Sequence, residues 1–203
     1  GKSTLIQIIS GLLKGYEGKI LINGIDYSDK RVKRNELRRQ LGVVFQYPEY
    51  QLFEETVEKD IAYGPRKMGY SDEELSRSVR AAMEMVGLDY TTYKDKSPFA
   101  LSGGQKRKVA IAGVLSMNPN ILILDEPIAG LDPAGRESFM KLIEGLNHSG
   151  KTILMISHNM DNIAEYANRI LVLRKGELFA QGTPMDIFYD DGIISGAGLD
   201  VPD

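Results

Sequence analysis

Two acidic side chains follow directly after a strongly apolar segment. Ile121 to Leu124 (ILIL) runs into Asp125 and Glu126. A continuous apolar run is typical of a strand covered on both faces of a parallel sheet, and ligands gather at the carboxyl ends of such strands. Asp125 could hold Mg²⁺ there, and Glu126 could orient or deprotonate an attacking water. The pair also has an ordinary explanation, a strand that simply emerges into solvent.

The first four residues, Gly1, Lys2, Ser3 and Thr4, match the second half of a phosphate-binding loop and open a predicted helix. A helix N-terminus offers unpaired backbone N–H groups and partial positive charge to an anion. Lys2 could reach the β- and γ-phosphates, and the Ser3 hydroxyl could ligate Mg²⁺. A charged helix start without a ligand is the alternative. Because the first glycine of such a loop is not in the sequence, we expect a domain truncated at its N-terminus within the loop.

A second glycine-rich segment, Leu101-Ser102-Gly103-Gly104-Gln105, also begins a predicted helix. Ser102 can cap this helix, and glycines let a backbone approach an anion closely. The segment could therefore cradle phosphate, although an ordinary loop with a helix cap would look the same.

Two further polar residues follow predicted strands. Gln46 comes after LGVVF and could contact Mg²⁺ or an attacking water. His158 comes after TILMIS and could hydrogen-bond a γ-phosphate oxygen. A lone glutamine or histidine is more often structural than catalytic, so the position of each after a strand is the main evidence for a role. The other histidine, His148, lies in a turn and receives no assigned function.

The elements that must position these residues alternate between helix and strand patterns, which predicts an α/β fold with a mainly parallel sheet. We expect a helix at Ser3 to Leu13, an Asn23-Gly24 hairpin, a capping box from Ser71 to Glu74, and strands at 41–45, 121–124, 152–156, 170–173 and 177–181. Residues 1–46 and 119–189 are expected to form the core and a small β lobe, 47–118 a mostly helical subdomain, and 190–203 a tail with little periodicity.

Composition narrows the class of protein. The 203 residues carry a formal net charge of −3 with both signs mixed, which does not favour a nucleic-acid binder. A local basic cluster, Lys30 to Arg39, is expected to be solvated, with an acidic lipid or RNA contact as the minority alternative. The absence of cysteine excludes disulfides. No apolar run approaches the roughly 20 residues that a membrane-crossing helix requires.

Taken together, the order of Gly-Lys-Ser-Thr, Gln46, LSGGQ, ILILDEP, Ala129-Gly130-Leu131-Asp132 and His158 resembles the ATP-binding cassette (ABC) ATPase family. The resemblance implies a P-loop NTPase-like core, a small antiparallel β lobe, a helical subdomain that carries LSGGQ, and ATP with Mg²⁺ as the ligands. It also implies two cassettes paired head to tail around two ATP molecules. One cassette supplies Gly1, Lys2, Ser3, Thr4, Gln46, Asp125, Glu126 and His158, with Ser3, Gln46 and Asp125 on Mg²⁺ and with Glu126, His158, Gln46 and Lys2 in catalysis. The other supplies Ser102, Gly103, Gly104 and Gln105, and Asp132 belongs to the loop that links the two sites.

The strings YPEYQLF after Gln46, TVEKDIAYG, and Ser97-Pro98-Phe99 before the signature look like the ATPase subunits of energy-coupling-factor (ECF) importers, which take up vitamins and transition-metal ions. The implied partners are a second cassette, a transmembrane coupling component and a substrate-binding membrane component, with the chain peripheral at the cytoplasmic face of the cell membrane. The aromatic cluster Tyr47, Tyr50 and Phe53 suits a groove for the membrane partner, and packing within the helical subdomain is the equal alternative. The other readings are an ATPase subunit of another ABC transporter, a soluble ABC ATPase, and a non-catalytic subunit.

Overall fold

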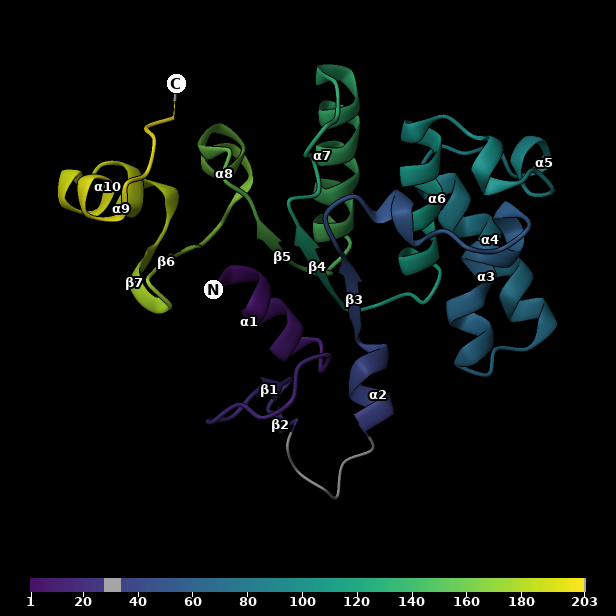
Figure 1. Ribbon diagram of the computed structural model, residues 1–203, viewed down its shortest axis with the longest axis horizontal. Helices are drawn as coiled ribbons and strands as arrows, with labels where there is room; N and C mark the ends of the chain where they lie inside the picture. Colours follow the sequence, from purple (N-terminus) through teal and green to yellow (C-terminus); the bar gives the residue numbers. More distant parts are fainter. Residues whose placement is uncertain (28–33, 203) are drawn as a thin grey trace. The chain divides into compact units, whose positions relative to one another are not determined.

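The computed structural model describes residues 1–27 and 34–202 and has the predicted mixed α/β architecture (Figure 1). It divides into two compact units, of which one comprises Glu17–Met155 and the other Gly1–Tyr16 with Ile156–Asp203. Each unit is described by itself below.

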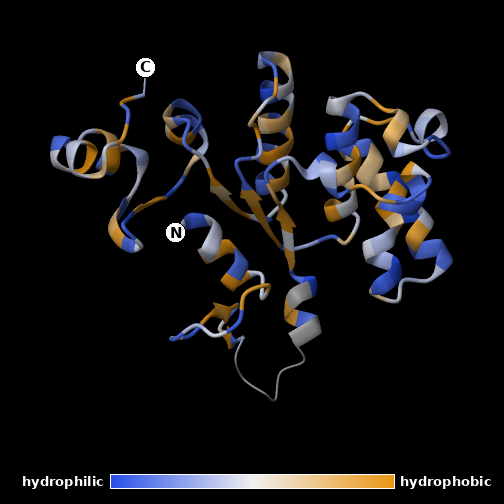
Figure 2. Ribbon diagram, in the orientation of Figure 1, coloured by the Kyte–Doolittle hydropathy of each residue, from blue (hydrophilic) through white to orange (hydrophobic). Residues whose placement is uncertain are grey.

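A parallel sheet forms the centre of the larger unit. Its strands β3 (Leu41–Val44), β4 (Ile121–Asp125) and β5 (Thr152–Ile156) lie in the order β3-β4-β5. Leu122, Ile123 and Leu124 of β4 are fully buried, and the strands stand out as apolar in Figure 2. β5 is only half-buried, although its sequence is almost wholly apolar.

Strand β3 packs closely against the end of the helix that precedes β4. A Cβ atom added to Gly42 would lie 2.7 Å from both Pro119 Cγ and Val114 Cγ1. Only glycine permits this approach without a shift of its neighbours. The close packing fixes β3 next to β4, and it thereby fixes the segment that leads to Gln46.

Residues 47–118 are mostly helical, as the sequence predicts. Their elements are η1 (Pro48–Gln51), α3 (Val57–Lys67), α4 (Asp72–Met85), α5 (Tyr90–Tyr93), η2 (Pro98–Ala100) and α6 (Gly103–Leu115). The predicted capping box of α4 is confirmed, because Ser71 and Glu74 satisfy each other's backbone N–H groups. Helices α3, α4 and α6 pack on one another around Ile61, Val79 and Met83, which are almost fully buried (Figure 1).

A small antiparallel lobe and one long helix complete this unit. Strands β1 (Leu21–Ile22) and β2 (Ile25–Asp26) pair antiparallel across Asn23 and Gly24, whose φ values of 51° and 78° confirm the predicted hairpin turn. Ile22 and Tyr27 pack with Leu37 of α2 (Arg34–Arg39) and with Leu41 of β3. Helix α7 (Pro133–His148) follows β4 and buries Phe139, Met140, Ile143 and Leu146.

The smaller unit contains α1 (Lys2–Ile9), α8 (Met160–Tyr166), β6 (Ile170–Arg174), β7 (Glu177–Gly182), α9 (Pro184–Phe188) and α10 (Asp191–Ala197). Helix α1 ends four residues before the predicted Leu13, because Gly11 adopts a φ of 72°. The segment from residue 190, expected to be irregular, contains α10, whose N-terminus is capped by the Asp190 carboxylate.

The strands predicted at 170–173 and 177–181 are present as β6 and β7, and they form a separate antiparallel hairpin. Only Lys175 and Gly176 separate them, and both residues have positive φ values. A two-residue connection permits only antiparallel pairing, since parallel neighbours need a long crossover.

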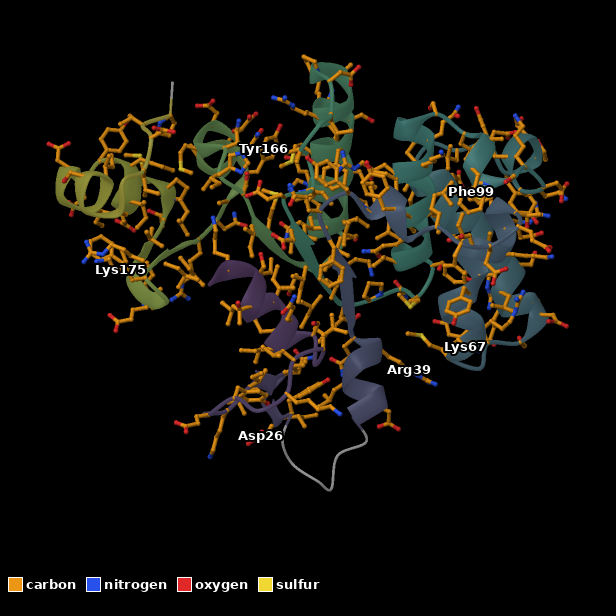
Figure 3. The ribbon with its side chains drawn as sticks, viewed as in Figure 1. Asp26, Arg39, Lys67, Phe99, Tyr166 and Lys175 are labelled. Carbon is orange, nitrogen blue, oxygen red and sulfur yellow. The ribbon has the colours of Figure 1, made fainter. Side chains whose placement is uncertain are left out.

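Of the basic cluster at 30–39, Lys30, Arg31 and Lys33 lie outside the described residues, as do the side chains of Arg34 and Arg38. Arg39 is the last residue of α2. It donates a 2.7 Å hydrogen bond to the carbonyl of Met68, the residue after Lys67 (Figure 3). No helix in the described part of the chain is long and apolar enough to cross a membrane.

Candidate nucleotide site

The carboxyl ends of β3 and β4 bring three of the predicted site residues to one edge of the sheet. The strands are parallel, with Val44 opposite Leu124, so Gln46 follows one strand end and Asp125 and Glu126 follow its neighbour. Asp125 is 9% exposed, whereas Gln46 is exposed. The two strand ends therefore bring a buried carboxylate and an exposed amide to the same edge of the sheet.

Glu126 has a strained backbone. Its φ is 47°, a left-handed conformation that is uncommon outside glycine, asparagine and aspartate. Such strain persists only where the surroundings impose it, and it concentrates at functional sites. Here the chain turns sharply, since the Ala129 N–H donates to the Glu126 carbonyl at 3.2 Å and Gly130 takes a φ of 76°. The turn directs the chain from the buried strand into the loop that ends at Asp132.

Asp132 is exposed and caps helix α7. Its Oδ1 accepts a 2.8 Å hydrogen bond from the Gly135 backbone N–H. The side chain therefore has a local structural task, in addition to the inter-site role that the resemblance implies.

Ser102 caps α6 as the sequence predicts. Its Oγ accepts from the Gln105 N–H at 3.3 Å, and the Gln105 side-chain oxygen accepts from the Ser102 N–H at 3.0 Å. The amide nitrogen of Gln105 also donates to the Tyr93 hydroxyl at 3.0 Å. This start of α6 is exposed, and Phe99 of the preceding η2 is exposed as well (Figure 3).

The two glycines of this segment are not required by crowding inside the chain. A Cβ added to Gly103 or Gly104 would meet no atom within 4 Å, and neither residue has a positive φ. Glycine in a helix costs about 0.5–1 kcal/mol relative to alanine. The contacts within the chain therefore do not explain the two glycines.

The smaller unit carries the remaining predicted residues. Gly1 is the N-cap of α1, with no side-chain hydrogen bond and no acidic residue in the first turn, and Lys2, Ser3 and Thr4 are exposed. His158 is exposed and lies between the buried Ser157 and Asn159, which caps α8. The helix start and the histidine thus belong to one compact unit.

The donors expected for Mg²⁺ are a hydroxyl, an amide oxygen and a carboxylate, from Ser3, Gln46 and Asp125. Magnesium prefers oxygen ligands and binds through one or two protein groups together with substrate phosphates. The chemistry of these donors therefore fits the ion. Within residues 1–27 and 34–202, no three His, Cys, Asp or Glu side chains gather into a metal cage.

The aromatic residues after Gln46 lie on the surface. Tyr47, Tyr50 and Phe53 are 40%, 84% and 57% exposed. The Tyr47 and Tyr50 rings lie 6.1 Å apart, and Phe53 packs edge-on against Tyr63 of α3 at 4.8 Å. Phe53 thus packs within the helical subdomain, while Tyr50 stays almost fully exposed. We call Tyr47, Tyr50 and Phe53 the aromatic face.

Two residues next to the signature segment escaped the sequence analysis. Tyr93 holds the Gln105 amide, and nothing in its sequence context signalled this role. Arg107 is 5% exposed on α6 and contacts Glu49 of η1 and the Ala129 carbonyl in the loop after β4. A signal for Arg107 existed, because it shares a four-residue spacing with the buried Ile111 and Leu115. A charged residue on the apolar face of a helix is buried with that face, and it therefore indicates a buried polar contact.

Comparison with known proteins places the chain. The profile of the family described as "ABC transporter" matches residues 1–129. An energy-coupling factor transporter ATP-binding protein, EcfA2, from Clostridium perfringens is 55% identical over all 203 residues, which cover 71% of that protein. The chain belongs to the ABC transporter family. Within this family it is similar to the EcfA2 proteins throughout its length, and the one from Streptococcus pneumoniae strain D39 is 46% identical over 100% of the chain and 73% of its own length.

Solved structures of ABC ATPases resemble this chain in fold as well as in sequence. The cbiO1 protein of Clostridium perfringens, described as part of the ABC transporter complex cbiONQ, has a TM-score of 0.80 and 41% identity over 97% of this chain and 78% of its own. A dimeric ATP-binding cassette in a post-hydrolysis state with ADP and phosphate has a TM-score of 0.76 and 32% identity over 91% and 81%. The predicted fold, ATP as ligand, ATP hydrolysis coupled to transport, and the ECF type are thereby confirmed.

Proposed function

We propose that this ABC ATPase hydrolyses ATP with Glu126 as the general base and so powers uptake of a vitamin or a transition-metal ion. The observation that carries the proposal is the parallel register of β3 and β4, which sets Gln46 beside Asp125 and Glu126 at one sheet edge. Asp125, Gln46 and Ser3 would hold Mg²⁺, which when bound would neutralise charge on the β- and γ-phosphates.

Glu126 is the group that orients and deprotonates the attacking water. A general base must be held firmly in one geometry, and the left-handed backbone at residue 126 presents its carboxylate directly after the buried strand. Its neighbour Asp125 stays at the strand end for the metal. Asp125 has the extended backbone of β4 and Glu126 a left-handed one, so the two adjacent carboxylates serve different tasks, one at the metal and one at the water.

The smaller unit binds the phosphate chain. The backbone N–H groups of the first turn of α1, free of any side-chain cap, donate hydrogen bonds to an anion. Lys2 adds a positive charge for the β- and γ-phosphates, Ser3 and Thr4 complete the loop, and His158 donates to a γ-phosphate oxygen.

The signature helix serves the nucleotide of a second cassette, which is either identical or a sister subunit. Open space around Gly103 and Gly104 leaves their backbone accessible to a phosphate from outside the chain. ATP that contacts both cassettes holds them together, and loss of the γ-phosphate contact after hydrolysis releases them, since a ligand stabilises the state it binds best. Asp132, at the end of the loop after Glu126, links the two sites.

The aromatic face is the docking surface for the transmembrane coupling component, which assembles with a substrate-binding membrane component at the cytoplasmic face of the cell membrane. Exposed aromatic side chains are enriched at protein interfaces. The similar cbiO1 protein is described as part of a transporter complex, which supports such an assembly. The transported solute contacts the membrane components and not this chain.

The test is the Glu126→Gln variant in the full-length protein. We expect ATP turnover to fall by about 100-fold or more, the usual contribution of a general base, while ATP still induces pairing of cassettes in light scattering. The matched control is Glu137→Gln on the exposed start of α7, where the pair with Lys141 is solvent-accessible; its turnover should be unchanged. Wild-type turnover in Glu126→Gln would refute the assigned base.

A further inference from the structure

Arg107 joins three segments that the proposed mechanism uses separately. It projects from the signature helix α6, and its Nη1 donates a 2.8 Å hydrogen bond to the Ala129 carbonyl in the loop between Glu126 and Asp132. Its Nε lies 3.4 Å from the Glu49 carboxylate in η1, three residues after Gln46. Its guanidinium carbon lies 6.0 Å from the Tyr47 ring centroid. One side chain thus connects the signature, the loop before Asp132, and the segment after Gln46.

The ion pair between Arg107 and Glu49 is buried, and some of its polar atoms lack a hydrogen bond. The Arg107 side chain is 6% exposed and that of Glu49 18%. Neither Nε nor Nη2 of Arg107 makes a hydrogen bond within the described residues, and neither does Glu49 Oε2. A buried ion pair is favourable only when its geometry is close to ideal. A small shift of Glu49 toward Arg107 would therefore change the strength of the pair strongly, by converting it to a bidentate bond.

The short helix η1 faces two ways. Glu49 points inward to Arg107, and the next residue, Tyr50, is 84% exposed on the aromatic face. Four residues in one tight helical turn cannot move their two faces independently. Pro48 at its start is buried and anchors the turn. A contact made at Tyr50 is therefore felt at Glu49 and, through the ion pair, at Arg107.

We propose that Arg107 is a positioning residue that, paired with Glu49, transmits docking of the membrane partner on the aromatic face to the signature helix and to the loop that ends at Asp132. The inference rests on the proposed function, because it takes the aromatic face as the docking surface. It adds the route by which docking alters hydrolysis. Coupling between two sites typically changes an equilibrium by 5- to 150-fold, so the ion pair has the capacity to control turnover.

The experiment compares ATP turnover of the full-length cassette pair with turnover of the same pair assembled with its membrane components. The variants are Arg107→Met, Arg107→Lys, Glu49→Gln and the Arg107→Met/Glu49→Gln double variant. Arg80→Met is the control, since Arg80 lies on α4 of the same helical subdomain and stacks on the Tyr90 ring at 3.9 Å. Thermal unfolding is recorded for each variant.

We expect the stimulation of kcat on assembly to fall by about 10-fold in Arg107→Met and Glu49→Gln, with KM for ATP within about twofold of wild type. The double variant should be no worse than Arg107→Met, because residues that act through one contact are not additive. Arg107→Lys should restore part of the stimulation. Glu49→Gln keeps the inference testable if Arg107→Met fails to fold, since glutamine has the size of glutamate and removes only the charge that pairs with Arg107.

Unchanged stimulation in folded Glu49→Gln and Arg107→Met would overturn the inference while leaving the proposed function intact. Multiplying losses in the double variant would overturn it too, because they would show independent structural roles. A wild-type protein without turnover or without stimulation would instead refute the proposed function, and the inference would fall with it.

Discussion

Gly104→Ala should stabilise the protein and inactivate it at the same time. Gly104 is the second residue of α6, its φ is not positive, and an added Cβ meets no atom of the chain within 4 Å. Alanine therefore fits without strain, and its higher helix propensity adds about 0.5–1 kcal/mol of stability. For a protein of this size that raises the thermal unfolding midpoint by about 1–4 °C.

The activity should change in the opposite direction. The added methyl group projects into the space that the proposed function reserves for a phosphate bound by the partner cassette. Loss of a backbone donor to a developing charge typically costs 10²–10³ in kcat, so we expect turnover to fall by about 100-fold. Steady-state ATP hydrolysis and a thermal scan of the nucleotide-free protein measure the two effects.

Gly145→Ala is the matched control. Gly145 lies inside α7, it is exposed, and a Cβ there also meets no atom within 4 Å. Its replacement should give the same thermal gain with unchanged turnover. The reasoning is refuted if Gly104→Ala keeps turnover within about twofold of wild type, or if it lowers the midpoint while Gly145→Ala raises it.

Two further predictions concern stability. Gly42→Ala should lower the free energy of unfolding by about 1–3 kcal/mol, because its Cβ would lie 2.7 Å from Pro119 Cγ and Val114 Cγ1; an unchanged urea midpoint would contradict the packing described for β3. Hydrogen bonds from Ser71 lower the pKa of Glu74 below its ordinary 4.5, so this cap stabilises the fold above that value and is lost as the pH falls through the lower folded-state pKa. Glu74→Gln should therefore flatten the acid side of the curve of unfolding free energy against pH, and a curve of unchanged slope would argue against the cap.

Local rules predicted the elements whose geometry is set within a few residues. The Asn23-Gly24 turn and the caps at Ser71 and Ser102 follow from hydrogen bonds and φ preferences that neighbouring residues decide. The buried run of β4 and the acids after it were also predictable, because a strand covered on both faces needs a continuous apolar sequence. These rules located Asp125 and Glu126 at the end of a strand.

Contacts between distant segments were not predictable from local patterns. The ion pair of Arg107 with Glu49 joins residues 58 positions apart and depends on how α6 packs on η1. The half-buried state of β5 is likewise not revealed by its apolar sequence. The helix predicted from Ser3 to Leu13 is too long for a different reason. It includes Gly11, which ends α1 by adopting a positive φ.

The central claim, that this ABC ATPase powers an ECF-type importer, is tested most directly by purification of the full-length tagged protein from detergent-solubilised membranes of its native host, with mass spectrometry of the bound proteins. The account predicts a second cassette and small multi-spanning membrane proteins in stoichiometric amounts, and their loss when the exposed Tyr50 is replaced by Asp. Recovery of the wild-type protein only from the soluble fraction, with ribosomal or DNA-repair proteins, would contradict it.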